Sequence, residues 1–252
     1  MARLKEYNGR YCESEYEYAF IGFLEAEGWK YSSGNNISRV TKRDVLIADD
    51  FKKFIADTNP DLTEDEVIQI YDNVRLVGAE SDFATLHKVY GWMVNGVQFT
   101  TQDGLPRMIP LIDFDNWDKN IFRVVNQFTV EYTNNGQKEN RRPDVLLFVN
   151  GMPLCVIELK NPADANATIY DAWEQINIRY WRDIPHLLHY CPLACISDGV
   201  KTRLGTVRTP YEHFYAWRRV NEGDAVSTLP FAETETMIKG VYAPERFMEI
   251  FR

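Results

Sequence analysis

The stretch Arg141-Arg-Pro-Asp-Val-Leu-Leu-Phe-Val-Asn-Gly-Met-Pro-Leu-Cys-Val-Ile-Glu-Leu-Lys160 decides how this chain folds. Two apolar runs, 145–149 and 154–159, lie on either side of Asn150-Gly151. An Asn-Gly pair between two apolar runs is typical of a tight β-hairpin, because both residues tolerate the positive φ angles of such a turn. The stretch therefore predicts a hairpin in the β-rich middle of the chain.

Three charged residues at the open end of this hairpin are predicted to share one patch. With the turn centred at Gly151, residue 144 lies opposite residue 158, so Asp144 faces Glu158 across the two strands. Lys160 follows Glu158 by two positions, and residues two apart point to the same face of a strand. Glu158 also lies inside an apolar run, where an unpaired carboxylate is costly.

A divalent cation would offset that cost, and two carboxylates completed by water and phosphate oxygens suit Mg²⁺. Asp144 and Glu158 are therefore candidate metal ligands. Lys160 is a candidate catalytic residue that could orient an attacking water and stabilise charge on a phosphoryl group. The same spacing also allows a simpler interpretation, in which Glu158 and Lys160 are an exposed charge pair on an edge strand and Asp144 is a turn residue.

The rest of the sequence places this hairpin in an α/β (α+β) domain. Ser14 and Glu17 have the spacing of a capping box at the start of the first predicted helix. The predicted helices are 13–28, 44–57, 63–75 and 164–182, with another beginning in 243–252. The predicted strands, besides the hairpin, are 83–101 (interrupted by turns), 109–112, 122–132, 193–196 and 207–217, and residues 221–236 are predicted as loop. This order predicts a central mixed β-sheet flanked by helices.

Composition and charge exclude several classes of protein. No stretch approaches the ~20 apolar residues of a membrane helix, and the first residues do not look like a signal peptide, so we expect a cytoplasmic protein without a membrane partner. The net charge of −9 argues against a general nucleic-acid coat protein, whose affinity comes mostly from neutralising phosphates. A negative net charge is compatible with an enzyme that binds a metal ion through acidic side chains.

Pro143-Asp144, followed by Glu158-Leu-Lys160, resembles the PD-(D/E)xK nuclease motif. Together with the residues around it, from Arg142 to Pro162, this motif resembles the N-terminal nuclease domain of the restriction (R, HsdR) subunit of type I restriction–modification enzymes. Further blocks agree in order over nearly the whole chain: Gly28-Trp29, Leu111-Ile-Asp-Phe114, Asn120-Ile-Phe122, Val125-Asn-Gln-Phe128, Ile184-Pro185, Ser197-Asp-Gly199 and Gly205-Thr206.

The resemblance implies a restriction-endonuclease-like PD-(D/E)xK core and an Mg²⁺-dependent endonuclease that cuts double-stranded DNA with little sequence preference. Asp144 and Glu158 match the metal-binding acids, and Lys160 matches the catalytic lysine. Glu17 matches a family acid on the first helix, although the capping box explains it equally well. The partners implied are DNA, the modification and specificity subunits, and C-terminal translocase domains of the same subunit that use ATP.

The helix after the lysine departs from the family pattern, which is Gln-x-x-x-Tyr. Here Gln175 and Tyr180 are one residue further apart. Gln175 is predicted to lie beside the active site. For Tyr180, a helix irregularity could restore the contact, Arg179 could replace it, or the tyrosine could simply be a packing residue. The candidate phosphate contacts are Arg142, Arg179, Arg182, Lys201 and Arg203, each of which could equally be a solvated surface charge.

The sequence contains no G-x-x-x-x-G-K-[S/T] phosphate loop, so no ATP site is expected in this chain. We therefore expect an N-terminal fragment, with the endonuclease domain in residues 1–220 and a polar loop and the start of a linker toward the translocase in 221–252. Two alternatives remain open: a non-catalytic docking or DNA-guiding module of the same subunit, or a free-standing nuclease of the same fold.

Overall fold

The computed structural model describes residues 13–77, 81–161, 168–227, 229 and 231–252. Its centre is a sheet with strand order β1-β4-β7-β8-β9-β10. The strands are β1 (Lys30–Ser33), β4 (Phe122–Asn126), β7 (Val145–Val149), β8 (Met152–Leu159), β9 (Leu193–Ser197) and β10 (Thr202–Thr206). The pairs β1/β4 and β8/β9 are parallel and the other neighbours are antiparallel, which confirms the predicted mixed sheet.

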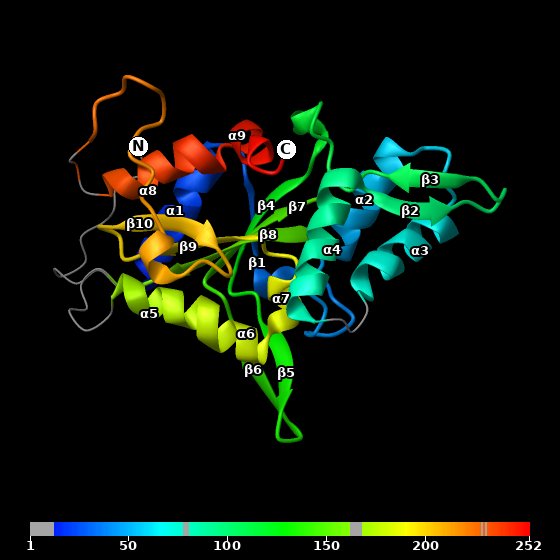
Figure 1. The fold of residues 1–252 in the computed structure, drawn as a ribbon, viewed down its shortest axis with the longest axis horizontal. Coiled ribbons are helices and arrows are strands. Elements are labelled where there is room, and N and C mark those ends of the chain that lie inside the picture. Colours follow the sequence, from blue (N-terminus) through cyan, green and yellow to red (C-terminus); the bar gives the residue numbers. More distant parts are fainter. Residues whose placement is uncertain (1–12, 78–80, 162–167, 228, 230) are drawn as a thin grey trace.

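Helices cover both faces of this sheet (Figure 1). Above it, as drawn, lie α1 (Glu13–Ala26), α8 (Ala232–Met237) and α9 (Pro244–Glu249), and below it lie α5 (Ile169–Glu174) and α6 (Trp181–Asp183). All residues of β7 and β8 are buried, because the hairpin lies in the middle of these layers. The shorter helices are α7 (Pro185–Leu188), the 3₁₀ turns Gly34–Asn36, Trp117–Lys119 and Tyr211–His213, and the π-helical segments Gln175–Tyr180 and Ile238–Tyr242.

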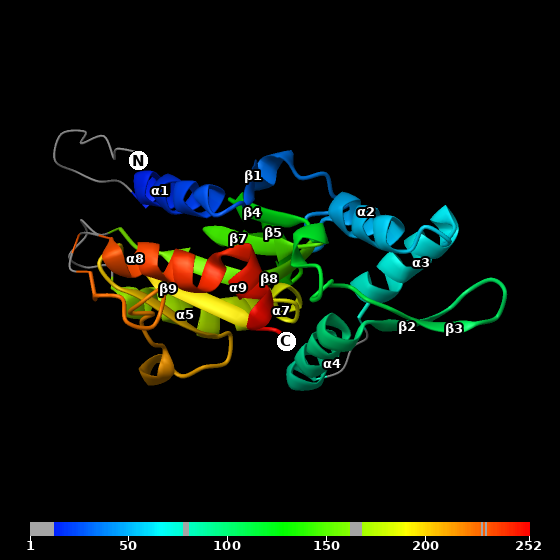
Figure 2. The same cartoon turned by 90° about the horizontal axis from the view of Figure 1, so that it is seen from above.

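The residues between β1 and β4 form a separate lobe beside the sheet, visible at the right of Figures 1 and 2. It contains α2 (Ala48–Thr58), α3 (Glu64–Arg75), α4 (Asp82–Asn95), β2 (Val97–Thr100) and β3 (Pro106–Ile109). The lobe contacts the turn of the central hairpin, where the Ile47 N–H donates to the Gly151 carbonyl at 2.8 Å. Gly151 has φ +76°, and a Cβ there would lie 2.3 Å from the Ile47 carbonyl oxygen, so this contact requires glycine.

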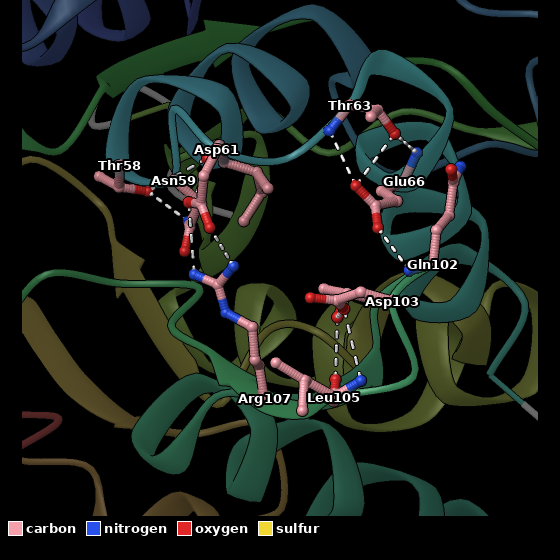
Figure 3. A network of polar contacts seen from close by, with 11 residues as sticks. Thr58, Asn59, Asp61, Thr63, Glu66, Gln102, Asp103, Leu105 and Arg107 are labelled. Carbon is pink, nitrogen blue, oxygen red and sulfur yellow. Dashed lines mark hydrogen bonds and ion pairs between the residues drawn. The ribbon is translucent and has the colours of Figure 1, made fainter.

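A polar network holds the lobe together (Figure 3). Thr63 and Glu66 form a capping box at the start of α3, and the second Glu66 oxygen accepts from the Gln102 N–H at 2.9 Å. Arg107 of β3 forms an ion pair with Asp61 in the turn between α2 and α3. These contacts fix the β2–β3 hairpin to the two helices.

Several predicted elements are wrong. The prediction of strands over 83–101 fails for its first part, which is α4. Ser81 caps this helix by accepting from the Ala84 N–H, and its buried residues Thr85, Val89 and Met93 recur every four positions. Residues 110–112 lie outside any strand, and the prediction for 122–132 covers β4 and a separate strand that begins at Val130.

Toward the C-terminus, the prediction of a strand at 207–217 is wrong. The strand in this region is β10, which ends at Thr206, and residues 207–217 contain the 3₁₀ turn Tyr211–His213. The loop prediction for 221–236 is wrong from residue 232, where α8 begins, and Met237, Tyr242 and Phe247 are buried in the common core. The domain boundary at 220 stays a prediction. In the part of the chain that the structure describes, no helix has the length and apolar character needed to cross a bilayer.

Candidate active site

The open end of the β7–β8 hairpin brings Asp144 and Glu158 together. Val145 pairs with Ile157, so the next position places Asp144 opposite Glu158, as predicted from the turn. The register depends on an irregularity, because Phe148 pairs with Pro153 while Leu147 pairs with Cys155. Leu154 is thus an extra residue, next to a proline that has no N–H for the ladder. Without it, the two-residue turn would place Ile157 opposite Asp144.

Both carboxylates accept hydrogen bonds from the hairpin backbone. The Leu159 N–H donates to Asp144 Oδ2 at 2.8 Å, and the Asp144 N–H donates to Glu158 Oε1 at 3.4 Å. The Glu158 side chain is fully buried. The two acids therefore form one unit at the end of the sheet. Because Glu158 is buried, it is not part of an exposed charge pair with Lys160, as the simpler interpretation required.

Gln175 joins the predicted lysine to the buried acid. Lys160 Nζ donates to Gln175 Oε1 at 2.9 Å, and Gln175 Nε2 donates to Glu158 Oε2 at 2.7 Å. The Tyr180 hydroxyl donates to the other Glu158 oxygen at 2.6 Å and accepts from Gln175 Nε2 at 2.9 Å. Each side chain of this group is thereby held in one orientation.

The lengthened spacing between Gln175 and Tyr180 is absorbed by a π-helical segment that covers these six residues. In a π-helix, residues five apart lie on one face, so an extra residue leaves both side chains directed at Glu158. Arg179 is exposed. Of the alternatives considered from the sequence, the structure shows the helix irregularity.

Burial dominates the electrostatics of this group. It raises the pKa of Glu158 well above its ordinary value, and the nearby charge of Asp144 raises it further, while Lys160 and the hydrogen bond from Tyr180 oppose the shift. The pKa of the Tyr180 hydroxyl is also raised well above normal, first by burial and then by the charge of Glu158. Without a cation, burial and the nearby charge of Asp144 therefore favour the protonated form of Glu158.

The donor chemistry of the two acids fits a hard divalent cation. Across the described ranges, no group of three or more histidine, cysteine, aspartate or glutamate side chains has metal-binding geometry. A cation bound by Asp144 and Glu158 would therefore take its other ligands from water and substrate oxygens, as Mg²⁺ often does. Its charge would also relieve the repulsion that raises the pKa of Glu158.

Glu17 reaches this site through a polar pair at the end of β4. It is buried in α1, where its carboxylate accepts from Asn126 Nδ2 at 2.6 Å and from Gln127 Nε2 at 3.0 Å. Gln127 has a left-handed backbone, φ +55°, and its N–H donates to the Asp144 carbonyl at 3.3 Å. The predicted capping box is wrong, because Ser14 lies within α1 and the Glu17 side chain contacts β4 instead. In this geometry Glu17 supports the backbone at Asp144.

Sequence reasoning did not assign a role at the site to Asn126 or Gln127. The available signal was the polar pair Asn126-Gln127, which interrupts the strand predicted over 122–132. Such a pair indicates side chains that leave the core toward a polar partner.

The predicted phosphate contacts are dispersed. Arg142, Arg179 and Arg182 are exposed, and Arg182 forms an ion pair with Asp183 at 2.7 Å. Lys201 is exposed beside β10, and the Arg203 guanidinium donates to the Phe214 carbonyl at 3.5 Å. Arg142 lies two positions before Asp144 in the sequence, which makes it the predicted contact next to the acids along the chain.

Comparison with known proteins agrees with this geometry. The family described as "Type I restriction enzyme R protein N terminus" matches residues 11–213. The chain is 31% identical to the "Putative type I restriction enzyme MjaIXP endonuclease subunit" of Methanocaldococcus jannaschii, over 92% of this chain and 24% of that protein. It is 30% identical to the "Type I restriction enzyme HindI endonuclease subunit" of Haemophilus influenzae, over 95% of this chain and 23% of that protein. The chain thus spans about a quarter of the length of these relatives.

Proposed function

Because the chain belongs to the family of type I restriction enzyme R protein N termini, we propose that it is the Mg²⁺-dependent DNA-cutting domain of such a protein. One observation carries the proposal: Asp144, Lys160, Gln175 and Tyr180 all converge on or around the buried Glu158. A buried acid with this many partners, at the end of a sheet, is expensive to maintain for stability alone.

In this proposal Asp144 and Glu158 hold the cation. When bound, Mg²⁺ would supply positive charge at the phosphate and lower the pKa of a water molecule. The Lys160 ammonium, oriented by Gln175, donates to a non-bridging phosphate oxygen and so stabilises the charge that develops there. Tyr180 and Gln175 keep both Glu158 oxygens in place by donating to them.

The reaction is hydrolysis of a DNA phosphodiester. A water oxygen attacks phosphorus, the bond from phosphorus to the 3′ oxygen breaks, and that oxygen leaves as a hydroxyl after taking a proton, which yields a 5′-phosphate. The proposed site contacts only phosphate and metal, so we expect little sequence preference.

The whole protein's activity is part of the same proposal. The relatives are named endonuclease subunits of type I restriction enzymes, and this chain corresponds to about a quarter of their length. We propose that cutting is coupled to ATP-driven translocation by other domains of the protein, and that modification and specificity subunits complete the complex that restricts foreign DNA.

The test replaces the lysine. In the intact restriction enzyme, Lys160→Ala is expected to abolish cutting of plasmid DNA while leaving ATP hydrolysis unchanged. Lys53→Ala, on the exposed surface of α2, is the matched control and is expected to cut normally. Cutting by Lys160→Ala at the parent rate would contradict the proposal. Absence of cutting by the parent enzyme, together with no binding of Mn²⁺ at Asp144 and Glu158, would favour a non-catalytic docking module instead.

A further inference from the structure

A two-stranded ribbon projects from the body of the molecule next to the candidate active site. It consists of β5 (Val130–Asn134) and β6 (Gln137–Arg141), which pair with each other and not with the central sheet. It points away from the core at the bottom of Figure 1. Its turn, Asn135-Gly136, has φ values of +48° and +78°, as in the tight turns that suit the twist of two strands.

We propose that this ribbon enters the major groove of the double-stranded DNA that is bound at the candidate active site. The inference rests on the proposed function, and it adds the surface by which the domain holds its substrate. The major groove is about 12 Å wide and admits a two-stranded β-ribbon.

The ribbon is firmly attached beside the acids. Arg141, its last residue, lies three positions before Asp144. The Arg141 guanidinium forms an ion pair with the buried Asp183 of α6 at 2.6 Å and lies 5.4 Å from the centre of the Tyr132 ring. A lone hairpin is only marginally stable in water, so these contacts hold the base of the ribbon in a fixed direction relative to the site.

The outer part of the ribbon has the chemistry of a nucleic-acid contact. Its exposed residues are polar or positively charged: Thr133, Asn134, Asn135, Gln137 and Lys138. Hydroxyl and amide groups can donate to and accept from base edges and phosphates, and lysine neutralises phosphate. This part exposes no large apolar side chain, which argues against docking to the apolar surface of another protein.

The acids of the ribbon have partners within it. Glu139 accepts from the Tyr132 hydroxyl at 2.6 Å and from Asn134 Nδ2 at 2.8 Å, and Glu131 lies 3.7 Å from the Lys138 ammonium. Over residues 130–142 there are two acids, Glu131 and Glu139, and three cations, Lys138, Arg141 and Arg142. The ribbon itself, residues 130–141, therefore has no net charge in a chain whose net charge is −9. Its outer part, from Thr133 to Lys138, has one positively charged and no negatively charged side chain, and Arg142 adds a positive charge at its base.

The dimensions are compatible with simultaneous contact. Five residues of strand extend about 17 Å, and the three residue steps from Arg141 to Asp144 extend at most about 10 Å. The tip can therefore reach the groove within a turn of DNA from a phosphate at the acids.

The experiment shortens the ribbon without changing its turn. Removing Thr133, Asn134, Gln137 and Lys138 deletes two cross-strand pairs and leaves Tyr132 opposite Glu139. Binding of the chain to a 30-base-pair duplex is measured in EDTA by fluorescence anisotropy, together with protection of guanine N7 from dimethyl sulfate. We expect at least about tenfold weaker binding and loss of guanine N7 protection.

Two controls make the result decisive. The double variant Gln137→Ala, Lys138→Glu keeps the backbone of the ribbon and is expected to weaken binding in the same direction, and Lys53→Glu, with the same charge change on α2, is expected to bind like the parent. The ribbon proposal fails if both ribbon variants bind as tightly as the parent. It also fails if the bound protein protects adenine N3 in the minor groove of the duplex, and not guanine N7, from dimethyl sulfate. Binding and protection are measured in EDTA, where no cutting takes place, so an error in the catalytic assignment would leave these measurements unchanged.

Discussion

Protonation of Glu158 would compete with the cation that we propose for this site. Its carboxylate is fully buried, so its pKa is raised well above the ordinary value by desolvation, and the charge of Asp144 adds to the effect. The hydrogen bond from Tyr180, at 2.6 Å, favours the charged form and opposes both effects. A tyrosine that could have been only a packing residue is thus part of the electrostatics of the acid.

Tyr180→Phe tests this role. Removing the donor is expected to raise the pKa of Glu158 further, because the charged carboxylate loses a hydrogen bond. Hydrogen bonds to charged groups contribute about 1.5–3 kcal/mol, so the pH of half-maximal cleavage should move measurably upward. The measurement is the cleavage rate against pH at fixed Mg²⁺.

Tyr190→Phe is the matched control, because Tyr190 is also buried and its hydroxyl donates to the Val74 carbonyl. It is expected to leave the pH profile where it is. A uniform loss of rate in Tyr180→Phe, with no movement along the pH axis, would mean that the hydroxyl acts on something other than the charge of Glu158.

At the scale of secondary-structure elements, the π-helical segment decides which side chains reach the acids. In a regular helix, the residue four positions after Gln175 would be Arg179, but the wider turn directs Tyr180 at Glu158 instead. The sequence showed the extra residue and left three outcomes open, which were a helix irregularity, replacement of the tyrosine by Arg179, and a packing role for Tyr180.

Deleting the exposed Ile178 tests this interpretation of the element. The deletion restores the spacing of four residues between glutamine and tyrosine, and a regular α-helix then keeps both on the face toward Glu158. We expect cleavage close to the parent rate and an unchanged or higher melting temperature. Inserting an alanine after Ile178 is the control, and it should abolish cleavage by rotating the glutamine away from the acid. Equal loss of activity in both variants would show that the π-helical geometry itself is required.

The hairpin and the lobe show what local sequence can and cannot predict. Asn150-Gly151 between two apolar runs specifies its own turn, so the hairpin could be predicted, and centring the turn at Gly151 leads to the pairing of Asp144 with Glu158. The extra residue Leu154 beside Pro153, on which that register depends, was not foreseen. The aromatic and β-branched residues of α4 favour a strand, but the segment forms a helix that buries one face, Thr85, Val89 and Met93.

At the scale of the whole molecule, the site is assembled from segments that are far apart in the chain. Glu17 from α1, Gln127 after β4 and the hairpin acids meet only because the helices pack on opposite faces of one sheet. Sequence reasoning could name candidate residues from their types and spacing. It could not show that Gln127 adopts φ +55° and links Glu17 to the Asp144 backbone, because that contact depends on tertiary packing.

The stability of the metal-free molecule should depend on pH through Glu158. Because its pKa is raised in the folded chain, the folded state holds a proton that the unfolded state releases above the ordinary carboxyl pKa of about 4.3. Stability should therefore fall as the pH rises from that value toward the raised pKa. Glu158→Gln removes the ionisation, so the variant should be more stable than the parent at pH 8, by on the order of 1 kcal/mol or about 2–4 °C in melting temperature.

Thermal unfolding in EDTA at pH 5 and pH 8 measures this difference, and Glu66→Gln provides a control of opposite sign. The pKa of Glu66 is lowered, chiefly by the Thr63 N–H, so its charged form is favoured and its replacement should destabilise the lobe. Mg²⁺ should then raise the melting temperature of the parent at pH 8 and leave Glu158→Gln unchanged, because a ligand stabilises only the state that binds it. A Glu158→Gln variant that is less stable than the parent at both pH values would show that the carboxylate is needed for packing. In that case the raised pKa could not be taken as stability given up for metal binding.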